Sequence, residues 1–115
     1  MSQPGTDLLQ GTLDLLILKT LSLCPMHGWG VSQRIQQMSR NALQVNQGSL
    51  YPALHRLENR GMIAAAWKET ETGREAKFYR LTRKGRARLE SETESWRRLA
   101  QAVGLILKLP EGGVE

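Results

Sequence analysis

Apolar residues recur at helical spacing in three stretches of the first sixty positions. These stretches run from about Thr12 to Leu23, from about Trp29 to Met38, and from Asn46 to Gly61. Leucine and isoleucine occur nearly all round the first stretch, which predicts a central helix covered on several sides. The second and third carry one stripe each at i, i+4 and i+7, namely Val31, Ile35 and Met38, then Leu50, Leu54 and Leu57. This pattern predicts two short helices joined by a turn, a helix-turn-helix.

The third stretch has clear end signals and one irregularity. Asn46 is a suitable N-cap and Gly61 a suitable terminator. Pro52 falls at about the sixth helical position, where it removes a backbone hydrogen bond to Gly48 at a cost of about 3 kcal/mol. The helix is therefore expected either to bend at Pro52 or to begin later than Asn46.

The outer face of this third helix differs from an ordinary helix surface. It carries Gly48, Pro52, His55, Arg56 and Asn59, with no acidic residue in its first turn. A helix that enters a DNA major groove needs small residues for close approach, donors for base edges, and its positive end toward phosphates. The stretch predicts a recognition helix, and an ordinary amphipathic helix remains the alternative.

After Gly61 the apolar period changes to that of strands. Met62–Trp67 and Ala76–Leu81 are short apolar or alternating runs on either side of the charged link Lys68–Glu75, which predicts a β-hairpin. A hairpin directly after a helix-turn-helix is the wing of a winged helix. The predicted tip is mixed in charge, because Lys68, Arg74 and Lys77 are interspersed with Glu69, Glu71 and Glu75.

A last, long helix is predicted from the N-cap Thr82 to about Lys108. About twenty-five residues span roughly 37 Å, more than the preceding body can cover. Leu89, Trp96 and Val103 are spaced by seven, with Leu99 and Ile106 offset by three, which forms a heptad-like seam. A homodimer through this seam is the favoured interpretation. Packing of the seam against the first helix is the alternative.

The fold class expected from these elements is mainly α (α+β). It consists of a winged helix-turn-helix domain in residues 1–82, with a two-stranded wing, and a C-terminal dimerisation helix and tail in residues 83–115. Residues 1–7 are expected to form a loose arm.

Charge adds a class of partner to this picture. Sixteen Lys and Arg against eleven Asp and Glu give a net charge of +5. The segment from Arg74 to Arg88 holds seven basic residues and only Glu75 as an acid. Such a patch favours a polyanion such as double-stranded DNA. Arg83 and Lys84 have the wrong sign for the start of a helix, so we hypothesise that they lie near phosphate.

Other chemistries find little support in the sequence. Cys24 is the single cysteine and is expected to be a buried structural thiol. With only His27 and His55 beside it, no metal set, cofactor motif or catalytic group is recognisable, so an enzyme is not expected. No apolar run is long enough to cross a membrane and no export signal is seen, so a cytoplasmic protein is predicted.

The motifs of this chain resemble those of the PadR family of winged helix-turn-helix transcriptional regulators. The resemblance rests on LLQGTLDLLILKTLS from Leu8, PMHGWGVSQRI from Pro25, GSLYPALHRLENRGMI from Gly48 and REAKFYRLTRKG from Arg74. Family members usually have Tyr where this chain has Trp29, so an aromatic residue is kept. The family also shares a proline at the position of Pro52. The short C-terminus resembles that of the smaller members.

The resemblance implies a homodimer that binds a pseudo-palindromic operator and usually represses transcription. Tyr51 is implied to contact a phosphate, although a half-buried core ring is nearly as well supported. Arg74 and Lys77 would serve the wing. The residues implied at or near the major groove are Gln47, Gly48, Ser49, Tyr51, Pro52, His55 and Arg56.

Two further interpretations stay open at this stage. Some relatives bind flat aromatic compounds between the dimer halves, and Trp96 could supply such a surface, although simple packing of this side chain is favoured. The rival to a DNA-binding regulator is a winged helix that serves as a protein-interaction module. The acid-free recognition face and the basic segment favour the regulator.

Overall fold

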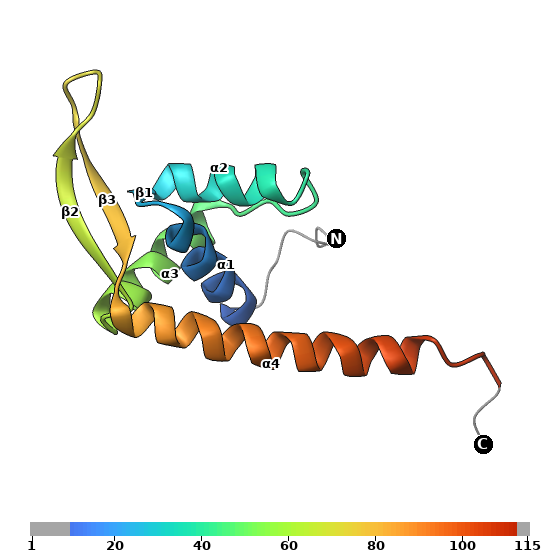
Figure 1. The fold of residues 1–115 in the computed structure, drawn as a ribbon. Helices are drawn as coiled ribbons and strands as arrows, with labels where there is room; N and C mark the ends of the chain where they lie inside the picture. The colour runs from blue at the N-terminus through green and yellow to red at the C-terminus, as the bar shows by residue number, and fades with distance from the viewer. Residues whose placement is uncertain (1–9, 113–115) are drawn as a thin grey trace.

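The structure of the protein, a computed structural model, describes residues 10–112. A body of three helices carries a β-hairpin on one side, and a long C-terminal helix runs beneath it and past it (Figure 1). The predicted arm at residues 1–7 lies outside the described residues. The predicted mainly α winged fold is confirmed, with one strand more than expected.

Helix α1, Gln10–Leu23, is the central element, as predicted. It contacts α2, α3, α4 and the sheet. Leu13, Ile17 and Leu21 are buried, and the buried hydroxyl of Thr20 donates to the Leu16 carbonyl at 2.7 Å. The helix begins at Gln10, two residues before the start at about Thr12 that the apolar pattern predicted.

The chain leaves α1 through an extended segment that the hydrophobic pattern did not reveal. Cys24 lies there and is exposed, so the prediction of a buried thiol is wrong. Pro25 then leads into the two-residue strand β1, Met26–His27, which pairs antiparallel with β3, Glu75–Leu81. This pairing turns Met26 inward and leaves the preceding residues in solvent.

Helix α2, Gly28–Met38, is capped by a side chain that we did not predict. The Nδ1 atom of His27 accepts a hydrogen bond from the Gly30 N–H at 2.9 Å. Val31 and Ile35 are buried as the stripe predicted. Met38 is 47% exposed, so its predicted inward position is wrong, because the helix ends there and the chain turns away.

Helix α3, Gln47–Asn59, is one continuous helix that contains Pro52. Asn46 is its N-cap, and Gly61 follows with φ of 75°, as the end signals predicted. The later start considered for this helix is therefore excluded. Leu50, Leu54 and Leu57 are fully buried and join α3 to the core.

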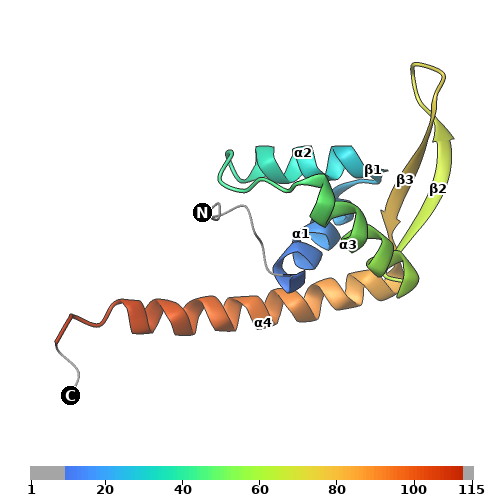
Figure 2. The same cartoon turned by 180° about the vertical axis from the view of Figure 1, so that it is seen from behind.

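The wing consists of β2, Ile63–Glu69, and β3, paired in register from Ile63 with Leu81 to Glu69 with Glu75. With β1 the sheet has the order β1-β3-β2. Tyr79 is buried and Arg80 is exposed on the opposite side, because successive side chains of a strand point to opposite faces. Only the base of the hairpin packs on the body, and the tip projects from it (Figure 2).

Helix α4, Arg83–Leu107, begins at the predicted N-cap Thr82, whose Oγ1 accepts from the Gly85 N–H at 3.0 Å. The same hydroxyl donates to the Gly61 carbonyl at 2.7 Å, and the Thr82 N–H donates to the Met62 carbonyl at 3.1 Å. These bonds fasten the start of α4 to the turn that follows α3. The second half of α4 extends beyond the body (Figure 1).

Candidate nucleic-acid interface

The first turn of α3 presents uncharged groups to solvent. Asn46 Oδ1 accepts a hydrogen bond from the Ser49 N–H at 2.9 Å, which fixes the turn. Gln47, Gly48 and Ser49 are exposed, and no acidic residue occurs in the turn. The positive end of the helix dipole therefore faces solvent without a compensating carboxylate.

The exposed face continues through Tyr51, Pro52 and His55. Tyr51 is 43% exposed, and one edge of its ring lies against α2. A Cβ atom at Gly28 would stand only 2.8 Å from Tyr51 Cε1, so the glycine is what lets the ring lie across the start of α2. The Tyr51 ring is thus partly covered by α2 and partly exposed. The exposed part of the side chain can contact a ligand in solvent.

Arg56 occupies a different position from the one expected of a base-reading side chain. Its Nη2 atom forms an ion pair with Asp14 Oδ1 of α1 at 2.7 Å, and its Nε atom is buried without a hydrogen-bond partner. Only a quarter of the side chain is exposed. Arg56 therefore ties α3 to α1, and we do not include it among the proposed base contacts.

This ion pair gives a direct test of the placement of Arg56. Replacing Asp14 by asparagine is expected to lower the free energy of unfolding by about 1 to 3 kcal/mol, because it leaves a poorly solvated guanidinium without its counter-charge. Urea denaturation measures the loss. Glu94→Gln is the control, since its pair with Arg98 is exposed and should contribute less than about 1 kcal/mol. Equal effects of the two substitutions would contradict the placement.

Lys77 of the wing is also engaged within the chain. Its Nζ atom lies 3.1 Å from Glu58 Oε1 of α3 and 5.6 Å from the centre of the Tyr79 ring. The hydrogen bond to Glu58 raises the pKa of Lys77 above its ordinary value, so the ammonium group stays charged. Arg74, at the tip, is exposed and forms no ion pair among the described residues.

A cleft of about 680 Å³ separates the wing from the helices. Trp29 and Tyr51 line its helical side, and Thr72, Arg74 and Lys77 line the wing side. The cleft thus combines aromatic surface, hydroxyl groups and two cations with one carboxylate, that of Glu75, between two projecting elements. A phosphodiester backbone that passes between a recognition helix and a wing meets this combination of groups.

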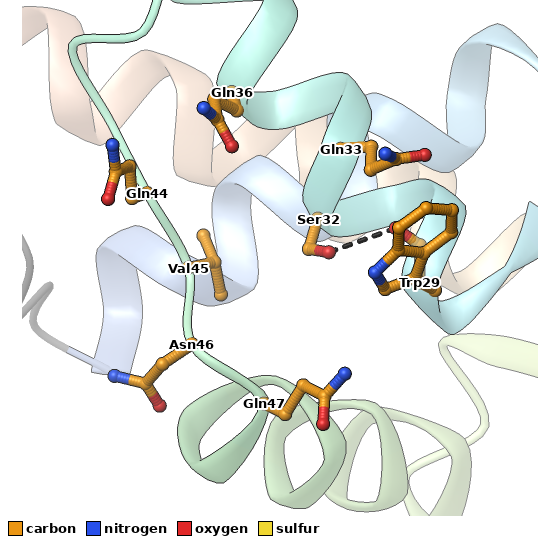
Figure 3. Close-up of a pocket in the computed structure, with 8 residues that line it drawn as sticks. All are labelled: Trp29, Ser32, Gln33, Gln36, Gln44, Val45, Asn46 and Gln47. Atoms are coloured by element: carbon orange, nitrogen blue, oxygen red, sulfur yellow. Dashed lines mark hydrogen bonds between the residues drawn. The ribbon is translucent and has the colours of Figure 1, made fainter.

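A second hollow, of about 360 Å³, lies between α2 and the segment that enters α3 (Figure 3). Its lining side chains are uncharged: Trp29, Ser32, Gln33, Gln36, Gln44, Val45, Asn46 and Gln47. The Ser32 hydroxyl donates to the Trp29 carbonyl at 2.9 Å. Amide side chains both donate and accept, so the groove can contact base edges or phosphate without contributing net charge.

Sequence reasoning missed Trp29 as a member of this surface, although Trp29 lines both hollows and is 52% exposed. The available signal was the His-Gly-Trp-Gly sequence at residues 27–30, in which His27 caps α2 and thereby fixes the position of the indole. The two rings stack with their centres 6.4 Å apart.

The seam of α4 divides into a covered part and an open part. Leu89 packs against the core, whereas Trp96, Leu99, Val103 and Ile106 are between 43% and 66% exposed. A cleft of about 650 Å³ between α1 and α4 is lined by Leu15, Leu16, Leu89 and Trp96 among others. The fold-back alternative therefore applies to Leu89 and in part to Trp96 and Leu99, which border hollows with α1, while Val103 and Ile106 are open in the single chain.

No helix within residues 10–112 is long and apolar enough to cross a bilayer. Within the same residues, no group of histidine, cysteine or acidic side chains is arranged to hold a metal ion.

A helix-turn-helix followed by a wing, with a helix whose first turn carries no acidic residue between two polar hollows, defines the class of winged helix-turn-helix DNA-binding proteins. The chain belongs to the transcriptional regulator PadR-like family, whose model matches residues 17–91. The family consists of DNA-binding transcriptional regulators rather than enzymes.

Individual relatives agree with this assignment. The chain is 38% identical over 68 residues to the transcriptional regulator Rv3488 of Mycobacterium tuberculosis, covering 59% of this chain and 63% of that protein. A PadR-like transcription factor structure from Bacteroides fragilis is 33% identical, covers 84% of this chain and 91% of its own, and has a TM-score of 0.70. The structure of smu.1704 from Streptococcus mutans is 27% identical, covers 100% and 98%, and has a TM-score of 0.77.

Proposed function

We propose that this protein is a repressor that binds a pseudo-palindromic operator as a homodimer, with α3 of each subunit in the major groove. One observation carries the proposal: the exposed N-terminal half of α3, from Gln47 to Pro52, has no acidic residue and lies between two hollows rich in hydrogen-bonding groups. Recognition helices need such a surface, because a carboxylate there would be repelled by the phosphates on both sides.

The proposed contacts follow from exposure and chemistry. Gln47, Ser49 and His55 carry exposed polar atoms that can form hydrogen bonds with base edges, while Gly48 allows the helix to approach closely. The Tyr51 hydroxyl and the uncharged groove of Figure 3 are assigned to the sugar–phosphate backbone. Arg74 is the wing residue assigned to phosphate.

The dimer is proposed through the open part of the α4 seam. An exposed apolar strip on α4 is formed by Trp96, Leu99, Val103 and Ile106. Helix α4 extends beyond the rest of the fold (Figure 2). A second copy of α4 would cover this strip and place two α3 helices on one face, as a two-fold symmetric operator requires. Repression is the usual output that the family resemblance implies.

A planar aromatic effector is a second candidate ligand, since the half-exposed Trp96 borders the apolar cleft between α1 and α4. If such compounds bind there, they are expected to quench tryptophan fluorescence, because stacking on an indole changes its emission. Titration of the protein with a planar dye measures the quenching. Trp96→Ala should abolish it, whereas Trp29→Phe and Trp67→Phe should retain it, and quenching that survives Trp96→Ala would exclude the site.

The test of the function is selection of duplexes from a genomic DNA pool, followed by gel shifts across a salt series. Ser49→Ala and His55→Ala are expected to relax base selection at single positions, with a loss of about 1 to 3 kcal/mol per contact. Gln37→Ala is the control, because Gln37 is exposed on α2 outside the groove. Binding that is uniform in sequence and vanishes with salt for all variants would instead favour a protein-interaction module.

A further inference from the structure

A concentration of unneutralised positive charge lies at the base of the wing, away from the surface described above. We call it the basic corner, formed by Arg60 at the end of α3, Arg80 on β3, and Arg83 and Lys84 at the start of α4. All four side chains are exposed. None of the four forms an ion pair with another of the described residues.

The fold holds the backbone positions of these four residues close together, and Arg60 also borders a small hollow with Asp14, Arg88 and Glu92. The Thr82 hydroxyl bonds to the Gly61 carbonyl and the Thr82 N–H bonds to the Met62 carbonyl, so the start of α4 is fixed beside the residue that follows Arg60. Lys84 Cδ lies 3.9 Å from the position of a Cβ on Gly61. Arg80 is opposite Ala64 in the same corner of the hairpin. The four charges therefore come from three elements that cannot separate without unfolding this corner.

The local structure does not explain all of these charges. Arg60, at the C-terminal end of α3, is favourable for that helix dipole, whereas Arg83 and Lys84 are unfavourable at the N-terminal end of α4. Farther along the same helix, Arg88 pairs with Glu92 and Arg98 with Glu94. No acidic residue occurs between Ala76 and Leu89, so Arg83 and Lys84 have no such partner on β3 or in the first turns of α4. An unfavourable charge that is kept without compensation indicates an external partner of opposite sign.

The tip of the wing offers less positive charge to the same partner, although Arg74 is available there. Glu69, Glu71 and Glu75 lie there with Lys68 and Arg74, and Lys77 is held by Glu58. The positive charge of this wing is thus at its base rather than at its tip. Helix α3 is about 20 Å long, whereas the major groove is about 12 Å wide. A helix with its N-terminal half in the groove has its C-terminal end at the level of the bordering phosphates.

We propose that the basic corner binds the phosphate backbone of the DNA strand that borders the groove occupied by α3. This inference rests on the proposed function, since it uses the same duplex. The corner supplies charge and position without reading bases, while the exposed face of α3 supplies the base contacts.

The test compares two double variants that lose the same net charge. Arg83→Gln with Lys84→Gln removes half of the basic corner. Arg98→Gln with Lys108→Gln removes two exposed charges, one from the far half of α4 and one from the residue that follows its end. Gel shifts use one duplex retained in the selection described above. Each lost phosphate contact is expected to reduce the slope of log affinity against log salt by about 1. In the proposed dimer each of the two subunits loses two contacts, so the corner variant should lose about 4 from the slope, and the control variant should lose nothing.

Phosphate-ethylation interference on the same duplex locates the contact. The corner variant should lose interference at one or two phosphates bordering the groove and keep the base selection of the unmodified protein. Its thermal unfolding midpoint should be equal or higher, because the removed charges oppose the α4 dipole. A merely structural role would lower the midpoint and leave the phosphate pattern unchanged.

Two results would overturn the inference while leaving the proposed function intact. One is an equal loss of slope in both variants, which would indicate net charge alone. The other is an unchanged slope and phosphate pattern in the corner variant, in which case an acidic protein surface would become the candidate occupant. Absence of selective binding by the unmodified protein would instead overturn the proposed function, and this inference with it.

Discussion

Replacing Leu99 and Ile106 together by glutamate is expected to convert the protein into a monomer and to weaken operator binding by roughly 10²- to 10⁴-fold. In the proposed dimer these side chains meet their symmetry mates, and four carboxylates would be buried against one another without partners. Loss of the dimer makes the two half-sites independent, so the gain from simultaneous engagement disappears. Sedimentation measures the mass, and a gel shift on the selected duplex measures the affinity.

Leu105 provides a closely matched control for this substitution. Leu99 and Leu105 are both 61% exposed in the single chain. If only burial within the monomer mattered, replacing either leucine by glutamate would change the stability of the protein equally. Leu105 lies off the heptad seam, and Leu105→Glu should therefore leave the mass and the affinity unchanged. If Leu105→Glu dissociates the protein as well, or if the double variant stays dimeric, the proposed interface is wrong.

Replacing Gly85 by alanine is expected to lower the free energy of unfolding by about 2 to 3 kcal/mol, the range of an overpacked core. Gly85 is buried in the first turn of α4, and a Cβ atom there would overlap the Met62 carbonyl oxygen. That carbonyl cannot simply move away, because it accepts the Thr82 N–H. The better helix propensity of alanine, worth about 1 kcal/mol, offsets only part of the clash.

Urea denaturation of Gly85→Ala beside Gly11→Ala separates this contact from the general effect of removing a glycine. A Cβ atom at Gly11 would meet nothing within 4 Å, so Gly11→Ala should not lower the free energy of unfolding, and its better helix propensity should raise it by up to about 1 kcal/mol. A Gly85→Ala protein as stable as the unmodified chain would show that the start of α4 can shift away from the α3–β2 turn.

Much of the fold could be predicted because its signals are local. The leucines of α3 repeat at the period of one turn, and Asn46 and Thr82 cap helices through bonds to residues three positions later. The wing could be predicted because the spacing of apolar residues changes after Gly61 from that of a helix to that of strands. Each of these features depends on neighbours within a few residues, which the sequence displays directly.

The features that sequence reasoning missed depend on distant partners or on helix ends. Strand β1 has only two residues and exists because Met26 and His27 meet Tyr79 and Phe78. Periodicity alone extended the stripe of α2 to Met38, where the helix ends and nothing covers the side chain.

Arg56 and Lys77 illustrate the same limit at the candidate interface. Their carboxylate partners, Asp14 and Glu58, lie 42 and 19 positions away in the chain. A helical wheel places Arg56 beside His55 on the outer face, but the long side chain reaches back to α1. Which cations remain available to an external partner thus depends on tertiary contacts, which the sequence pattern does not display.

The attachment of α4 also bears on how an operator must be laid out. Thr82 and Gly85 fix the start of α4 to the turn after α3, and the helix continues unbroken to Leu107. In the proposed dimer the continuous helix α4 therefore connects the α3 helix of each subunit rigidly to the two-fold axis. One extra base pair between half-sites would displace a half-site by about 3.4 Å and turn it by about 34°. A rigid α4 cannot adjust to this displacement and rotation. The number of base pairs between the half-sites is therefore itself a feature of the operator that the protein distinguishes.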